Sequence, residues 1–270
     1  MRIFMLDALP MKNYRLLAGK PLYRHIIETL LQVPEISVVA VDTDSPVVME
    51  GLRSSFPQVQ IIERAAHLTA DTVPMNEILM YDTNQVEADF YLQNRADKGF
   101  TVIQAVILSE RNGLEEANAY GELPLINKNP DQPNEGYFKQ VDYIVDRAES
   151  LGLFMGILPT WGKYWNSTTP TDNIFTEQNA AHFGEYLGKR YKDKPVIWIL
   201  GGDHNIHTEK DRKIIEALAA GLKRGDGGTH LITYHPRGPG FSSDYFHQAA
   251  WLDFNMVQSS HAAHDHDNGL

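Results

Sequence analysis

The sequence predicts an α/β fold that is built on a mainly parallel sheet. Short apolar runs bounded by turn residues predict strands; these runs lie at 37–41, 59–62, 100–108, 153–158, 196–200, 230–234 and 254–257. Helical patterns separate the strands, at 21–33, 86–98, 137–150, 179–190 and 209–224. Strands that alternate with helices form βα units, and the strands of such units pair in parallel.

Each helix is predicted from a stripe of apolar residues or from a residue that ends it. The helix at 21–33 has an apolar stripe of Leu22, Ile26, Leu30 and Leu31, and the one at 137–150 has an apolar stripe of Phe138, Val141, Ile144, Val145 and Ala148. The helices at 86–98 and 209–224 are followed by Gly99 and Gly225, a residue type that commonly ends helices.

Composition narrows the class of protein. The chain has 270 residues, 43% of them hydrophobic, so it can bury a core, and its net charge of -11 disfavours a nucleic-acid partner. It has no cysteine, which excludes disulfides and a cysteine nucleophile. No apolar run is long enough for a membrane span. The start of the chain, with Asp7 and Pro10, does not look like a secretory signal, so the cytoplasm is the default expectation.

Aromatic, amide and acidic residues follow four of the predicted strands. They lie in the segments LPTWGKYW, ILGGDHN, TYHPRG and VQSSH. Carboxyl ends of parallel strands share one edge of a sheet, and such residues there suit a sugar-binding site at the mouth of a barrel. Asp203 follows two glycines at the end of its strand. It is a candidate general acid for glycosidic-bond cleavage, although an aspartate here could equally cap a helix.

The segment 86–270 closely resembles the apiosidase-like glycoside hydrolases, which are (β/α)₈-barrel enzymes of plant-polysaccharide degradation. Five ordered motifs carry the resemblance, including VIWILGGDHN and GDGGTHLITYHPRG. It implies that Asp203 is the acid/base. It also implies a carbohydrate substrate and no cofactor. The residues implied to line the sugar site are Gln104, Trp161, Trp165, His204, Asn205, His235, Gln258 and His261. Trp161 and Trp165 could equally pack at the rim, and His235 could equally be an ordinary loop histidine.

The same resemblance predicts an incomplete barrel. The chain matches strands two to six of eight, and the family's second carboxylate, a glutamate on a later strand, falls beyond Leu270. A retaining mechanism needs that second carboxylate as its nucleophile, so catalytic activity is in question. Glu110, which follows the strand at 100–108, is the candidate substitute. Asp253 precedes its strand and should lie at the opposite end of the barrel.

The segment before residue 86 has a different character. KNYRLLAGKPLYRHIIETLL, followed by the strand that ends in DTDS, resembles the acylneuraminate (CMP-sialic acid) cytidylyltransferases over about 11–92. The resemblance implies that Lys12, Asn13 and Lys20 are vestigial nucleotide contacts, since the family's phosphate loop and metal-binding acids are missing. We therefore expect two parts, a partial cytidylyltransferase-like segment at 1–85 and a partial hydrolase-like barrel at 86–270.

The sequence favours a hydrolase but leaves two alternatives, a cytidylyltransferase-like fragment and an inert chimera. An open barrel has unpaired edges, which could pair with 37–41 and 59–62 to give one continuous sheet, or allow self-association. The tail with His261, His264 and His266 has metal-compatible spacing, but a solvated terminus explains it better, and no metal is predicted.

Overall fold

The computed structural model describes residues 16–17, 19–32, 39–43, 45–63, 79–80, 83–110 and 112–258. The chain forms two compact units. The first comprises Met1–Pro74 and Arg95–Thr101, and the second comprises Met75–Asn94 and Val102–Leu270. Among the helices of the described residues, none is long and apolar enough to cross a membrane.

The described part of the first unit contains a β-α-β element. Its elements are β1 (Leu16–Leu17), β2 (Lys20–Pro21), α1 (Leu22–Leu31), β3 (Ala40–Thr43), α2 (Pro46–Ser55) and β4 (Gln60–Glu63). Strands β1 and β2 pair antiparallel, and β3 and β4 pair parallel with α2 between them. Helix α2 was not predicted. Its signal is Ser45–Pro46: the Ser45 hydroxyl accepts from the Val48 amide, and Pro46 takes the first helical position.

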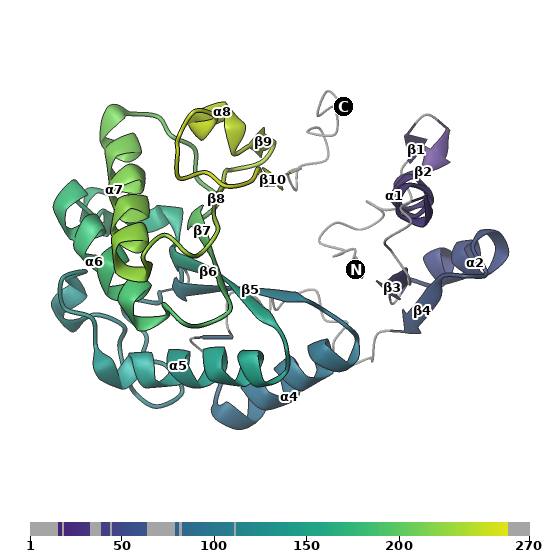
Figure 1. The fold of residues 1–270 in the computed structure, drawn as a ribbon, viewed down its shortest axis with the longest axis horizontal. Helices are drawn as coiled ribbons and strands as arrows, with labels where there is room; N and C mark the ends of the chain where they lie inside the picture. The colour runs from purple at the N-terminus through teal and green to yellow at the C-terminus, as the bar shows by residue number, and fades with distance from the viewer. Residues whose placement is uncertain are drawn as a thin grey trace. The chain divides into compact units, whose positions relative to one another are not determined.

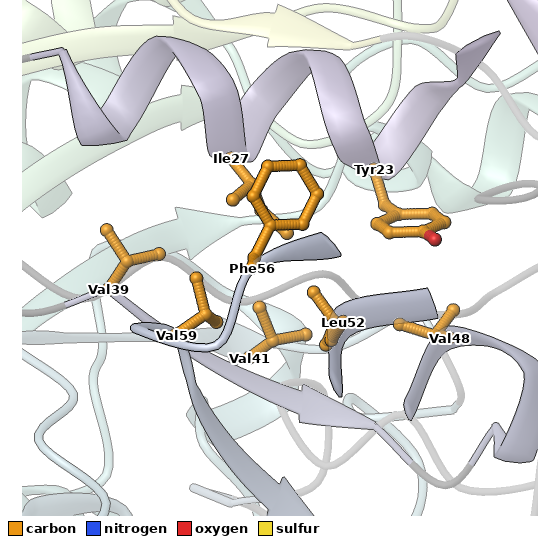
Figure 2. Packing of buried hydrophobic residues seen from close by; sticks show 8 residues of the cluster. All are labelled: Tyr23, Ile27, Val39, Val41, Val48, Leu52, Phe56 and Val59. Atoms are coloured by element: carbon orange, nitrogen blue, oxygen red, sulfur yellow. The ribbon is translucent and has the colours of Figure 1, made fainter. Parts of the chain in front are cut away.

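A small apolar core holds the first unit together. Figure 2 shows Tyr23 and Ile27 pointing from α1 toward side chains of the β3–α2–β4 element. The buried cluster consists of Tyr23, Ile27, Val39, Val41, Val48, Leu52, Phe56 and Val59. Tyr23 and Ile27 lie outside the apolar stripe that the sequence predicted for this helix. The buried face of α1 therefore includes positions that the periodicity did not identify.

The second unit is a series of βα units (Figure 1). Its main elements are α4 (Gln85–Asp97), β5 (Val102–Leu108), α5 (Glu135–Ser150), β6 (Phe154–Thr160), α6 (Glu177–Arg190), β7 (Val196–Gly201), α7 (Glu209–Asp226) and β8 (Ile232–His235). Shorter elements are η3 (Ile126–Lys128), η4 (Gly162–Tyr164), η5 (Pro170–Asp172), β9 (Gly240–Phe241), α8 (Ser243–Phe246) and β10 (Val257–Gln258). The four helices and four of the five strands predicted for this unit are thus confirmed. In the first unit, β4 matches the strand predicted at 59–62, and β3 overlaps the one predicted at 37–41.

Four parallel strands form the sheet of this unit in the order β5-β6-β7-β8. One face contacts the helices: the Tyr137 hydroxyl on α5 donates to the Ile107 carbonyl at 2.8 Å, and the Trp198 indole on β7 donates to Asp226 of α7 at 3.2 Å. The other face carries a buried cluster of Val106, Leu158, Trp161 and Ile199. Consecutive parallel βα units of this kind are consistent with part of a (β/α)₈ barrel.

Helices α6 and α7 lie side by side in unusually close contact (Figure 1). A Cβ atom on Gly221 would lie 2.2 Å from the Ala181 carbonyl oxygen, and one on Gly225 would lie 2.5 Å from the Glu185 carbonyl oxygen. Gly225 was predicted to end the helix, but α7 continues to Asp226 and Gly227 caps it with a φ of 78°. The glycine at 225 instead lets the two helix backbones approach.

Two predictions about strand pairing were wrong. The segment 254–257 is no parallel strand; only β10 forms there, and it pairs antiparallel with β9. Two backbone groups of this segment form hydrogen bonds with side chains instead of with a neighbouring strand. Thr233 Oγ1 donates to the Phe254 carbonyl, and the Met256 amide donates to Ser242 Oγ. Among the described strands, β3 and β4 pair only with each other. They therefore do not extend the four-stranded sheet, and no nucleotidyltransferase-like sheet is established.

Candidate active site

The candidate site lies at the carboxyl edge of the four-stranded sheet, where the loops after β5, β6, β7 and β8 meet. Backbone contacts join these loops in sequence. The Trp161 amide donates to the Leu108 carbonyl at 3.1 Å, and the Gly162 amide donates to the Gly202 carbonyl at 3.0 Å. The loop after β7 therefore lies directly against the loop after β6, as the strand order requires.

Asp203 occupies a tight turn after β7. Its φ is 58°, and the preceding Gly201 and Gly202 have φ of 95° and 88°, so three consecutive residues are left-handed. At Gly202 a Cβ atom would lie 2.8 Å from Trp161 Cα, which excludes any larger residue there. Asp203 is half-buried, and its amide donates to His235 Nδ1 at 3.2 Å. The structure thus places Asp203 beside both Trp161 and His235.

Two tryptophans from the β6 loop have different environments. The Trp161 ring is 8% exposed and lies 6.0 Å from the His235 ring, centroid to centroid. Trp165 is 1% exposed, and its indole nitrogen donates to the Gly201 carbonyl at 2.9 Å. The sequence placed both rings at the sugar. The buried Trp165 instead supports the turn that carries Asp203.

His204 and Asn205 complete the β7 loop, and both are half-buried. The His204 ring packs over Gly162, where a Cβ atom would lie 2.1 Å from the imidazole. The His204 carbonyl accepts from the Tyr234 hydroxyl at 2.5 Å, and Asn205 Oδ1 accepts from the Arg237 amide at 2.9 Å. The β7 loop is therefore fastened to the β8 loop as well. Sequence reasoning missed Tyr234, whose place directly before His235 was its only signal.

Glu110 follows β5 at the same edge and is half-buried. Its backbone carbonyl accepts from Lys163 Nζ at 3.4 Å, so it neighbours the β6 loop. The neighbouring Tyr164 hydroxyl donates to the Ser109 carbonyl at 2.6 Å, and burial raises the pKa of Tyr164 to about 12. A shallow hollow lies next to these residues, lined by Asn112, Leu114, Glu115, Lys128, Lys163, Tyr164, Thr171, Asp172 and Ile174.

Other predicted site residues lie elsewhere. Gln104 pairs with Gly156 and stands four residues before the end of β5, roughly 13 Å along the strand from its carboxyl end. Gln258 lies on β10, paired with Gly240. Asp253 accepts from the Ile232 amide at the start of β8, the end opposite the site, as expected. His261, His264 and His266 lie outside the described residues.

The three residues predicted as vestigial nucleotide contacts do not form a recognisable binding site in the described part of the chain. Lys12 and Asn13 lie outside the described residues. Lys20 is exposed and forms an ion pair with Glu28 on α1, which lowers the pKa of that carboxyl. Across the residues that the structure describes, no three His, Asp or Glu side chains gather as a metal site would require.

A family model for the apiosidase-like catalytic domain matches residues 64–269, beginning before residue 86, where the sequence placed the start of the barrel-like segment. No curated protein gave a significant match. The comparisons give no support to a cytidylyltransferase segment or to a chimera of two families.

Two solved structures are similar over 69% of this chain. One is described as a glycoside hydrolase, with 35% identity and a TM-score of 0.58. The other is a glycoside hydrolase family 5 protein from Bacteroides vulgatus, with 34% identity and a TM-score of 0.59. The match covers 41% and 39% of those two chains, so this chain spans about two fifths of their length.

Proposed function

The chain belongs to the apiosidase-like glycoside hydrolases, and from this membership we propose that it cleaves glycosidic bonds in plant cell-wall glycans, with Asp203 as general acid/base. The observation that supports this role is the place of Asp203. It lies at the carboxyl end of β7, in a left-handed turn held by the loops of the neighbouring strands. Residues at this end of barrel strands are the ones that act in catalysis.

The chemistry of the proposed step is proton transfer to the leaving oxygen. A general acid must stand close to that oxygen and keep one orientation while the bond breaks. The half-buried position of Asp203 leaves its carboxyl within reach of a ligand, and the fastened turn limits the directions in which the side chain leaves the backbone. The polar side chains of His204, Asn205 and His235 suit sugar hydroxyls, and Trp161 lies beside His235.

Glu110 is the proposed second carboxylate. A retaining enzyme needs its two carboxyl groups about 5–5.5 Å apart, and an inverting enzyme needs them about 6.5–9.5 Å apart. Glu110 stands at the same edge of the sheet as Asp203, two strands away. If it acts as the partner of Asp203, Glu110→Gln removes the activity as completely as Asp203→Asn does.

The test is release of reducing sugar from pectic oligosaccharides by the wild type and by Asp203→Asn. We expect release by the wild type and a loss of about 10²–10⁴-fold in the variant, the usual contribution of general acid catalysis. Asp193→Asn is the matched control, since Asp193 is an exposed carboxylate before β7, at the opposite end of the strand. Equal activity of wild type and Asp203→Asn contradicts the assignment, and an inert wild type contradicts the function.

A further inference from the structure

The turn at 201–203 is held by hydrogen bonds to the β6 loop and to strand β8. An L-residue such as Asp203 rarely adopts the left-handed conformation, and its neighbours must stabilise it there. Within the turn, the Gly201 and Gly202 carbonyls accept from the β6 loop, and the carbonyl of the following residue, His204, accepts from the Tyr234 hydroxyl. The amide of Asp203 itself has a side-chain acceptor, the Nδ1 atom of His235 at 3.2 Å.

That contact determines where the proton of His235 lies. A backbone N–H can only donate, so Nδ1 must present its lone pair, and a neutral imidazole then carries its proton on Nε2. The ring also packs near Trp161, with the two ring centroids 6.0 Å apart. The plane of the imidazole and its tautomer are therefore both constrained by the protein.

We propose that His235 is a positioning residue for Asp203. In its Nε2–H tautomer it accepts from the Asp203 amide and keeps that residue in the left-handed conformation from which its carboxyl reaches the substrate. This inference rests on the proposed role of Asp203 as the acid/base. It differs from a role for His235 in sugar binding, because it assigns the function to Nδ1 and to a backbone partner.

Two substitutions distinguish the roles of the two ring nitrogens of His235. Asparagine can place its side-chain oxygen near the position of Nδ1, and His235→Asn thus keeps an acceptor for the Asp203 amide. Glutamine reaches instead to the position of Nε2, so His235→Gln loses that acceptor but keeps a polar group toward the site. Both replacements are uncharged amides, and the thermal midpoints of the two variants provide the control for folding.

The first measurement does not depend on activity. Isotope-labelled protein is used to follow exchange of the Asp203 amide proton by NMR, and the ring nitrogens of His235 are observed in the wild type. We expect an Nε2–H tautomer, and exchange at Asp203 at least about tenfold slower in the wild type and in His235→Asn than in His235→Gln. A proton on Nδ1, or equal exchange in the three proteins, overturns the proposal.

The second measurement is the kinetics of glycoside hydrolysis. A misaligned acid slows the chemical step, so we expect kcat of His235→Gln to be about tenfold or more below that of His235→Asn, while KM agrees within about threefold. A difference confined to KM assigns His235 to substrate binding and overturns the positioning role. An inert wild type refutes only the proposed function. The amide exchange at Asp203 and the tautomer of His235 still test the contact between these two residues.

Discussion

Replacing Gly221 with alanine tests how closely helices α6 and α7 pack. The added Cβ atom would lie 2.2 Å from the carbonyl oxygen of Ala181 and 3.0 Å from the amide nitrogen of Glu185. Ordinary van der Waals contact begins at 3.4 Å. The nearer atom belongs to the backbone of α6, so a change of side-chain rotamer cannot relieve the overlap. The two helices must move apart by about 1 Å to restore normal contact.

The expected cost follows from two opposed effects. Overpacking a well-packed interface costs about 1–3 kcal/mol, and a backbone obstacle places this site at the upper end. Alanine is the better helix former by about 1 kcal/mol, which offsets part of that cost. The net loss in the free energy of unfolding is about 2 kcal/mol. With a urea m-value of about 2 kcal/mol/M, the midpoint falls by about 1 M.

Urea unfolding followed by tryptophan fluorescence measures this loss in the unit that contains the helices. The four tryptophans, Trp161, Trp165, Trp198 and Trp251, all belong to the second unit, so their signal is specific to it. The matched control is Ala220→Gly, at the adjacent exposed position of α7. It alters helix propensity without altering the contact and should cost about 1 kcal/mol.

The comparison has a clear refuting result. Propensity alone predicts that Gly221→Ala stabilises the protein and Ala220→Gly destabilises it. If close packing governs position 221, both variants are destabilised. A midpoint for Gly221→Ala at or above that of the wild type would show that the helices do not approach as closely as described.

Two further predictions concern buried polar groups. Burial raises the pKa of Tyr164 to about 12 and raises that of Tyr234, whereas an unfolded tyrosine ionises near 10. The stability contributed by the two protonated tyrosines is therefore fully present below pH 10 and is lost as the pH rises to 12 and beyond. The urea midpoint should fall over that range, and a midpoint that stays constant contradicts this prediction. Asp226 is fully buried, and it accepts from the Trp198 indole beside the His230 ring. Asp226→Asn should therefore lower the free energy of unfolding by about 3 kcal/mol in the same urea assay. A loss below about 0.5 kcal/mol contradicts the buried network.

Much of the parallel sheet could be predicted from local pattern. The runs at 100–108, 153–158, 196–200 and 230–234 became β5 to β8, because strands buried on both faces have nearly continuous apolar sequence. The run at 254–257 was predicted as a further strand of the same sheet, but only Val257 of it is in a strand, β10, which pairs antiparallel with β9. The hydroxyls of Thr233 and Ser242 occupy its backbone groups, and such side-chain contacts have no sequence period.

The candidate site was predictable in its location and less so in the role of each residue. Asp203, Trp161 and His235 come together because carboxyl ends of parallel strands meet at one edge. Trp165 shows the limit of that reasoning. A tryptophan in a polar loop is a plausible sugar-binding residue. Trp165 is instead buried, and its indole nitrogen donates to the Gly201 carbonyl, which belongs to another loop that the local sequence does not reveal. Gln104 lies on β5, four residues before the carboxyl end of that strand.

The loop after β7 is fastened almost wholly through its backbone. Trp165 and Tyr234 donate to carbonyls of Gly201 and His204, and His235 accepts from an amide. Any residue that the backbone can accommodate at these positions offers the same carbonyl, so such a substitution neither breaks nor rescues these contacts. Correlated amino-acid changes among relatives should therefore be weak between these positions. Contact maps inferred from covariation would then underestimate how tightly this part of the protein is joined.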